Sequence, residues 1–136
     1  MNTFSTEQKP NMVTAIAVMT LISGVINILW GLVASLSAMA TLIGFVCTPF
    51  TILPTILGIF EVIYAEKLLR NPAQPVRPST SIAAFEILCL MTGNMFSMIV
   101  GILSLVFYND MTVKRFFDNL NGAASTLSPT PQPASE

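Results

Sequence analysis

The sequence predicts an all-α integral membrane protein, a bundle of three transmembrane helices followed by a short C-terminal interfacial amphipathic helix. Of its 136 residues, 53% are hydrophobic and 10% are charged, and the mean hydropathy is +0.72. A soluble domain carries about a quarter charged residues. No charged residue occurs between Lys9 and Glu61, or between Glu86 and Asp110. Because about twenty apolar residues cross a bilayer, the first interval can hold two spans and the second can hold one.

The first span is expected over about residues 12–40, after a polar N-terminus (1–11) that is expected to be disordered. Small and polar residues recur along this span at steps of three and four, which places them on one helix face. They are Ala17, Thr20, Gly24, Asn27, Gly31, Ala34 and Ala38. In lipid, large residues can face the acyl chains while small residues let helix backbones approach closely. Gly24 and Gly31 are therefore predicted helix-packing positions.

The second span is expected over about residues 49–69 and has the same pattern. Its small and polar face comprises Thr51, Pro54, Gly58, Glu61 and Ala65, which makes Gly58 another predicted packing position. After it, residues 70–79 contain three prolines at three-residue intervals. Such a segment favours an extended, polyproline-like conformation, so we expect a stiff strap between the second and third spans.

The third span is expected over about residues 80–108, as one long tilted helix. One face of that helix would carry Glu86, Cys89, Gly93, Ser97, Gly101, Ser104 and Tyr108. Gly93, Ser97 and Gly101 form consecutive small-xxx-small steps, which are typical of helix packing in membranes. The alternative is a shortened helical hairpin that turns at Gly93–Asn94. Such a hairpin would leave backbone groups unpaired inside lipid unless neighbouring helices covered them.

A short helix is expected over residues 110–121, because Asn109–Asp110 is a good N-cap pair. Val113, Phe116, Phe117 and Leu120 share one face, opposite Lys114, Arg115 and Asp118. This helix is too short to cross a bilayer, so it should lie in the membrane interface. The tail, residues 122–136, is rich in Ser, Thr and Pro and is expected to be disordered.

The distribution of lysine and arginine predicts the orientation. With three full spans, Lys9, Lys67, Arg70 and Arg77 lie on one side of the membrane, and Lys114 and Arg115 lie on the other. The N-terminus is then cytoplasmic and the C-terminus is outside, with Tyr64 and Tyr108 near opposite boundaries. The hairpin alternative would place all six cationic residues inside.

Two carboxylates, Glu61 and Glu86, lie within the predicted spans at nearly the same depth from the strap, and both are on the small-residue faces. Two carboxylates in a dry interior cannot both ionise cheaply, so at least one should hold a proton. They are a candidate intramembrane proton or cation site, or structural groups that hydrogen-bond across helices. Asn27 and Asn94 form a similar pair, for which an interhelical hydrogen bond is expected.

Several functions are not expected for this chain. Histidine, the commonest metal ligand and general base, is absent. The sequence has no phosphate-binding loop and no nucleophile elbow, so no enzyme activity, metal or cofactor is predicted. A net charge of −1 gives no means of neutralising a row of phosphates, so no nucleic-acid partner is expected. The expected partners are membrane lipid and either further copies of the chain or a larger membrane protein.

Three strings, TLISGVINILWG, ILPTILGIFEVIYAEKLL and GNMFSMIVGILSLVFYND, resemble a group of small bacterial multi-pass membrane proteins of unknown function. The resemblance covers residues 12 to about 120 and depends mostly on apolar positions. It implies a multi-pass protein of the bacterial inner membrane and implies no activity.

The function expected from these features is a non-enzymatic accessory or scaffold subunit of a homo- or hetero-oligomeric membrane complex. The alternative is an oligomeric proton-coupled transporter or channel that uses Glu61 and Glu86. A water-filled cavity that reached the two carboxylates would favour transport, whereas a dry, closed contact would favour the scaffold.

Overall fold

The computed structural model describes residues 9–126, with no side chain described at positions 42, 43, 45, 47, 48 and 123–126. Over this part of the chain all regular elements are helical, which confirms the all-α class. They are α1 (Asn11–Met39), α2 (Leu42–Thr51), α3 (Leu53–Leu69), α4 (Thr80–Leu88), the 3-10 turn η1 (Cys89–Thr92), α5 (Met95–Tyr108) and α6 (Met111–Thr126). The predictions of disorder for residues 1–8 and 127–136 lie outside the described residues.

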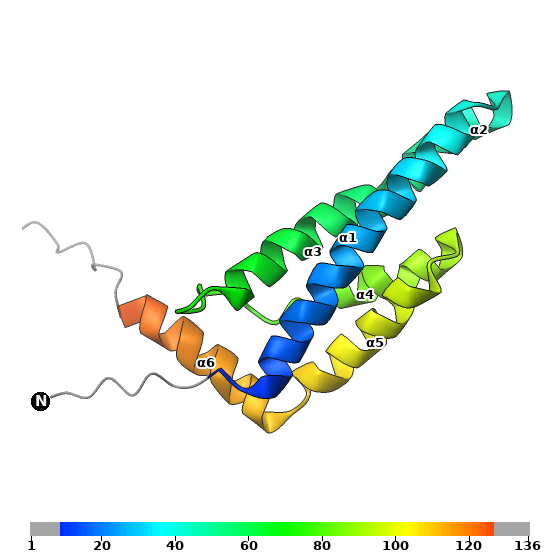
Figure 1. Ribbon diagram of the computed structural model, residues 1–136. Helices are drawn as coiled ribbons and strands as arrows, with labels where there is room; N and C mark the ends of the chain where they lie inside the picture. The colour runs from blue at the N-terminus through cyan, green and yellow to red at the C-terminus, as the bar shows by residue number, and fades with distance from the viewer. Residues whose placement is uncertain (1–8, 127–136) are drawn as a thin grey trace, which may run out of the picture.

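The helices form two hairpins of unequal length. In Figure 1, α1 runs beside α3 and extends with α2 to the far end of the molecule, while α4 and α5 form a shorter hairpin against them. At about 1.5 Å per residue, the 29 residues of α1 span about 43 Å and the 14 residues of α5 about 21 Å. The short hairpin therefore turns back part of the way along α1.

Small residues set the contact between α1 and α3. A Cβ atom added at Gly24 would lie 2.8 Å from the carbonyl oxygen of Gly58, and one added at Gly58 would lie 2.5 Å from the carbonyl oxygen of Gly24. Farther along, Gly31 lies directly against Thr55. The two backbones approach closely where both helices present hydrogen instead of a side chain. The small-residue faces read from the sequence are thus the surfaces that pack.

The prediction of one helix over residues 80–108 is wrong. After α4, the chain tightens into η1 and then reverses at Gly93, whose φ of +82° lies in the left-handed region that glycine adopts without steric cost. Asn94 then begins α5, because its side chain accepts a hydrogen bond from the N–H of Ser97. The structure instead matches the alternative, a hairpin that turns at Gly93–Asn94.

The second helical segment begins earlier than residue 49, the predicted start. Thr41 caps α2 by accepting a hydrogen bond from the N–H of Gly44 at 3.0 Å, so the helix starts at Leu42. Pro49 lies inside α2, and a short break at Ile52 separates α2 from α3. Pro54 lies in the first turn of α3, where an N–H group would have no partner within the helix, so the lack of an N–H on proline costs no hydrogen bond.

A cluster of apolar side chains closes the end of the bundle where α1 and α4 begin and where α3 and α5 end. It contains Val13, Ile16, Ala17, Tyr64, Leu68, Ala83, Tyr108, Val113, Phe116 and Phe117. The hydroxyl of Tyr108 donates a hydrogen bond to the hydroxyl of Tyr64 at 3.1 Å. The prediction that these two tyrosines mark opposite boundaries is therefore wrong, because the hairpin returns α5 to the end from which α4 starts.

Helix α6 folds across this end and buries Val113, Phe116 and Phe117 (Figure 1). Asp110 caps the start of α6: its carboxylate accepts the N–H of Thr112, and this bond lowers the pKa of Asp110. The helix continues to Thr126, so the prediction of a disordered tail from residue 122 is wrong for residues 122–126. Asn121 helps to anchor it by donating to the carbonyl oxygen of Val76 at 3.1 Å.

The start of α1 is also held at this end, so the prediction of disorder is wrong for residues 9–11. The ammonium group of Lys9 donates to the carbonyl oxygens of Leu68, at 2.5 Å, and Arg70, at 3.1 Å. These carbonyls end α3 and lack partners within the helix. Partial burial lowers the pKa of Lys9. Lys9 thus ties the start of α1 to the end of α3.

All six lysines and arginines therefore lie at the same end of the molecule, which we call the charged end: Lys9, Lys67, Arg70, Arg77, Lys114 and Arg115. The opposite end, made by residues 39–53, contains no charged residue, and neither does η1 at the turn of the short hairpin. The predicted split of four cations against two is wrong, because it assumed that residues 80–108 cross from one end to the other.

By length and composition, α1 is the one helix in the described chain that can cross a membrane by itself. Helices α5 and α6 pass the same test only as a pair, which bends by 79° between them. Helix α3 has 17 residues, which span about 26 Å, somewhat less than the hydrocarbon core of about 30 Å.

We predict that Gly24→Ala destabilises the fold, because its methyl group would meet the backbone of Gly58. Overpacking of this kind costs about 1–3 kcal/mol. Gly122→Ala is the matched control, because nothing lies within 4 Å of a Cβ atom at that exposed position of α6. Thermal unfolding of the purified protein in detergent measures both variants. Equal unfolding temperatures for the two variants would contradict the close α1–α3 contact.

Candidate functional site

A network of buried polar side chains lies where the short hairpin turns, and Asn27 of α1 is at its centre. The Asn27 Nδ2 atom lies 2.9 Å from each carboxylate oxygen of Glu61 on α3, and 3.1 Å from the Oγ atom of Ser97 on α5. Its two hydrogens can therefore serve the carboxylate and the hydroxyl at once. One amide thus joins three helices.

Asn94 completes the network from the turn itself. Its Nδ2 atom donates to the Oδ1 atom of Asn27 at 2.6 Å, while its own Oδ1 atom accepts the N–H of Ser97. The expected hydrogen bond between Asn27 and Asn94 is present. Ser23 of α1 adds a longer bond, from its Oγ atom to that of Ser97 at 3.4 Å. These side chains satisfy the polar groups that the break between α4 and α5 brings into the interior.

The two glutamates are both fully enclosed but differ in their hydrogen bonding. Glu61 is 0% exposed and accepts both contacts from Asn27. Glu86 is 1% exposed, and neither of its carboxylate oxygens has a hydrogen-bond partner. Ser23 and Glu61 are polar neighbours of the Glu86 carboxyl group, but no donor is hydrogen-bonded to either of its oxygens. Glu86 is therefore a buried acid without a donor.

The position of Glu86 follows from the close contact between α4 and α5. A Cβ atom added at Gly101 of α5 would lie 2.6 Å from the carbonyl oxygen of Ala83 and 2.9 Å from the Cβ atom of Glu86. Glycine at this position lets the two helices approach and holds the Glu86 stem in the bundle. Ser104, one turn nearer the charged end of α5, is also buried and has no hydrogen-bond partner for its Oγ atom.

The structure brings together most of the residues that the sequence singled out. Glu61, Glu86, Asn27, Asn94 and Ser97 are buried in one region between α1, α3, α4 and α5, and Gly24, Gly58 and Gly101 lie at helix contacts beside them. Gly93 is not a close backbone contact but the exposed turn residue of the hairpin, and a Cβ atom added there would meet only the Trp30 side chain of α1, at 3.8 Å. The sequence reasoning missed Ser23, although it lies four residues before Asn27 and therefore on the same face of α1.

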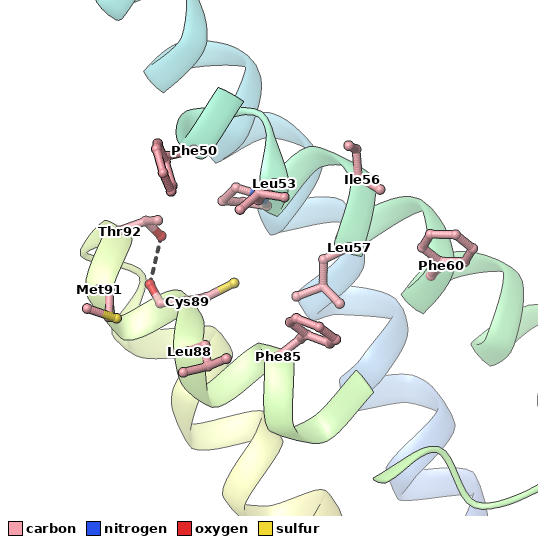
Figure 2. Close-up of a pocket in the computed structure, with 11 residues that line it drawn as sticks. Phe50, Leu53, Ile56, Leu57, Phe60, Phe85, Leu88, Cys89, Met91 and Thr92 are labelled. Carbon is pink, nitrogen blue, oxygen red and sulfur yellow. Dashed lines mark hydrogen bonds between the residues drawn. The ribbon is translucent and has the colours of Figure 1, made fainter. Parts of the chain in front are cut away.

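An apolar groove of about 570 Å³ lies between the long and short hairpins on the side of the uncharged end. Figure 2 shows its two walls, with residues of α2 and α3 facing residues of α4 and η1. The lining is Phe50, Leu53, Pro54, Ile56, Leu57, Phe60, Phe85, Leu88, Cys89, Met91 and Thr92. The one hydrogen bond drawn there, from Thr92 Oγ1 to the carbonyl oxygen of Cys89, ties the turn together. Neither glutamate lines this groove.

The chemistry available to this region is that of oxygen ligands and proton carriers. Among the described residues, no group of three or more His, Cys, Asp or Glu side chains could hold a metal ion. Comparison of the chain with known protein families, curated proteins and solved structures found no match. The functional conclusion therefore depends on the burial and contacts of the chain itself.

We predict that Asn94→Ala lowers the stability of the protein by about 2 kcal/mol or more, because it removes the cap of α5 and leaves the amide oxygen of Asn27 unpaired. Asn109→Ala is the control, since this exposed amide makes one bond, to the carbonyl oxygen of Leu105. A double-mutant cycle between Asn27 and Asn94, measured by thermal unfolding, gives the coupling. Additive effects at the two positions would contradict the network.

Proposed function

We propose that this chain is a small multi-pass integral membrane protein that acts as a non-enzymatic scaffold or accessory subunit. In this proposal, α1 crosses the membrane, and α2 and α3 bring the chain back to the side on which α1 begins. Helices α4 and α5, with η1 between them, form a re-entrant hairpin that enters the membrane from that side. The observation that carries the proposal is the arrangement of side chains beyond the apolar cluster of the charged end, where large apolar groups lie outside and small or polar groups lie inside.

The outer surface supports a lipid environment. Leu29, Val33 and Leu36 of α1 and Phe60 of α3 are more than half exposed, as are Met91 and Met95 at the hairpin turn. In a water-soluble monomer, contiguous apolar surface of this kind is uncommon. The interior beside it contains Ser23, Asn27 and the two glutamates, which is the reverse of a soluble core.

The charges give the proposed orientation. Cytoplasmic segments of membrane proteins are enriched in lysine and arginine, and all six of these residues lie at the charged end. We therefore propose that this end, with the segments before α1 and after α5, faces the cytoplasm. The proposal of a bacterial inner membrane follows from the resemblance of the three sequence strings.

The burial of the two carboxylates away from solvent favours the scaffold function over the transporter function. Glu61 and Glu86 are shielded from solvent, at 0% and 1% exposed, and the groove beside them is apolar. A proton or ion pathway requires polar groups or water along its length. The exposed apolar flanks of the two hairpins offer surface for further copies or for a larger membrane partner.

One observation favours the alternative function, a proton-coupled transporter or channel. The Glu86 carboxylate has no hydrogen-bond donor in an otherwise satisfied network. Intramembrane acids without a structural partner often lie on ion pathways.

The proposed topology predicts the pattern of cysteine labelling in a background with Cys47→Ser and Cys89→Ser. Ala73→Cys and Gly122→Cys should react with an impermeant maleimide from the same side of the membrane, because both lie at the charged end. Ala40→Cys, at the turn after α1, should react from the opposite side. Labelling of positions 73 and 122 from opposite sides would contradict the two-hairpin topology.

The scaffold proposal predicts that the purified chain in liposomes shows no proton flux above that of empty vesicles when a pH gradient is imposed. Mild-detergent extraction with chemical crosslinking should give a discrete oligomer or complex. Glu61→Gln should leave that assembly unchanged, since glutamine keeps the size and an acceptor oxygen for Asn27. A proton flux that is abolished by Glu61→Gln, with assembly unchanged, would reject the scaffold in favour of the transporter.

A further inference from the structure

We propose that Glu61 and Glu86 form an exchangeable site for one monovalent cation, either a proton or an alkali-metal ion, enclosed between α3 and α4. The proposal goes beyond the scaffold function, because a scaffold needs no exchangeable charge. It depends on the geometry of the two carboxyl groups and not on any flux across the membrane.

The first argument is that Glu86 lacks a donor. Its side chain is 1% exposed, and both carboxylate oxygens are without hydrogen-bond partners. Leaving an ionised carboxylate buried in this way is very costly unless it is neutralised by a proton, a cation or a charged partner. The carboxyl group of Glu86 lies beside the hydrogen-bonded side chains of Asn27 and Asn94 but shares none of their bonds. Its site therefore calls for one positive charge.

The second argument is that no side chain supplies that charge. The titratable groups that interact with Glu86 are Glu61 from α3, Tyr108 from α5, and Cys89 at the start of η1. From α1, the neighbour is the hydroxyl of Ser23. All the lysines and arginines lie at the charged end, where Lys9 binds carbonyl oxygens and Arg70 pairs with Glu66 at 2.6 Å.

The third argument concerns which carboxylate changes state. Asn27 donates to both oxygens of Glu61, and an ionised carboxylate, which only accepts, is the form that such a donor suits best. Glu61 can therefore stay charged as the fixed half of the site. Glu86 is the half that a proton neutralises or that coordinates an ion together with Glu61. The oxygens of Ser23 and of the two carboxylates are hard ligands, which suit an alkali-metal ion.

The fourth argument is a short route to the site. Leu57 and Cys89 form part of the groove lining and are buried, at 9% and 7% exposed. Glu61 follows Leu57 by four residues on α3, and Glu86 near the end of α4 precedes Cys89 of η1 by three. Each glutamate therefore lies about one helical turn from a buried residue of the groove lining and on the same side of its helix. The groove also reaches Phe60 and Phe85, which directly precede the two glutamates in the sequence. Small movements of α4 relative to α3 would open the pair to the groove.

Infrared spectroscopy of the full chain in lipid nanodiscs tests the proposal, because a protonated carboxyl group has its own C=O stretching band. Wild type in choline chloride should show one acid band that Glu86→Gln removes. The band should disappear as the pH is raised from about 5 to about 10. Glu66→Gln is the matched control, since Glu66 is exposed and paired with Arg70, and it should leave the band unchanged.

Replacing choline by sodium separates the two cations. If the site takes only a proton, sodium leaves the band unchanged at every pH. If it also takes an alkali-metal ion, sodium removes the band at a lower pH and raises the unfolding temperature of wild type but not of Glu86→Gln. A Glu86 band that persists across the whole pH range in both salts would overturn the proposal and leave a permanent structural acid. The absence of both the band and any sodium effect would overturn it as well.

The wild-type titration needs no substitution, so it decides the question even if Glu86→Gln does not fold. Its failure is also distinct from failure of the scaffold proposal, which is measured by flux and assembly. A chain that shows no flux can still bind and release one cation at Glu86.

Discussion

The first backbone N–H groups of a helix have no carbonyl oxygen of an earlier turn to bond with, so a helix that begins inside an apolar bundle leaves them unpaired. Helix α5 begins at such a place. Asn94 resolves this constraint by capping Ser97 with its carbonyl oxygen and by bonding Asn27 with its amide nitrogen. Asn27 in turn bonds Glu61, so the cap of the short hairpin is fixed to both helices of the long one. Without these bonds, the break at Gly93 would leave unpaired polar groups buried between the helices.

The rest of the architecture follows from that reversal. Since the chain turns back at Gly93, Tyr108 returns to Tyr64, and α6 can close the same end over Ile16 and Leu68. The reversal also gathers every lysine and arginine at one end. Glycines at 24, 58 and 101 bring the helices close enough for the short polar side chains to reach one another. Close packing and the polar network therefore depend on each other.

Much of the fold was readable from the sequence, because the long helices carry a strong signal. The face of small residues that includes Gly24, Asn27 and Gly31 predicted the buried side of α1. The prediction of a single third span is wrong for a physical reason. The residues of its predicted inner face keep their three-four spacing from Glu86 to Gly101, on both sides of the break. Periodicity alone therefore joins the two helices into one. The dipeptide Gly93–Asn94 carried the opposing local signal, a left-handed C-cap followed by an N-cap. The isolation of Glu86 could not be predicted, since it depends on side-chain geometry between helices.

The most direct test of the reversal at Gly93 is the distance between spin labels at Thr80 and Asn109, measured by double electron–electron resonance in nanodiscs. These exposed positions lie at the two ends of the short hairpin. The hairpin places them at the same end of the bundle and predicts a short distance, below about 25 Å, a bound set by two adjacent helices 8–10 Å apart and their label linkers. A continuous helix of 29 residues between them would give about 43 Å, and a distance near that value would contradict the account.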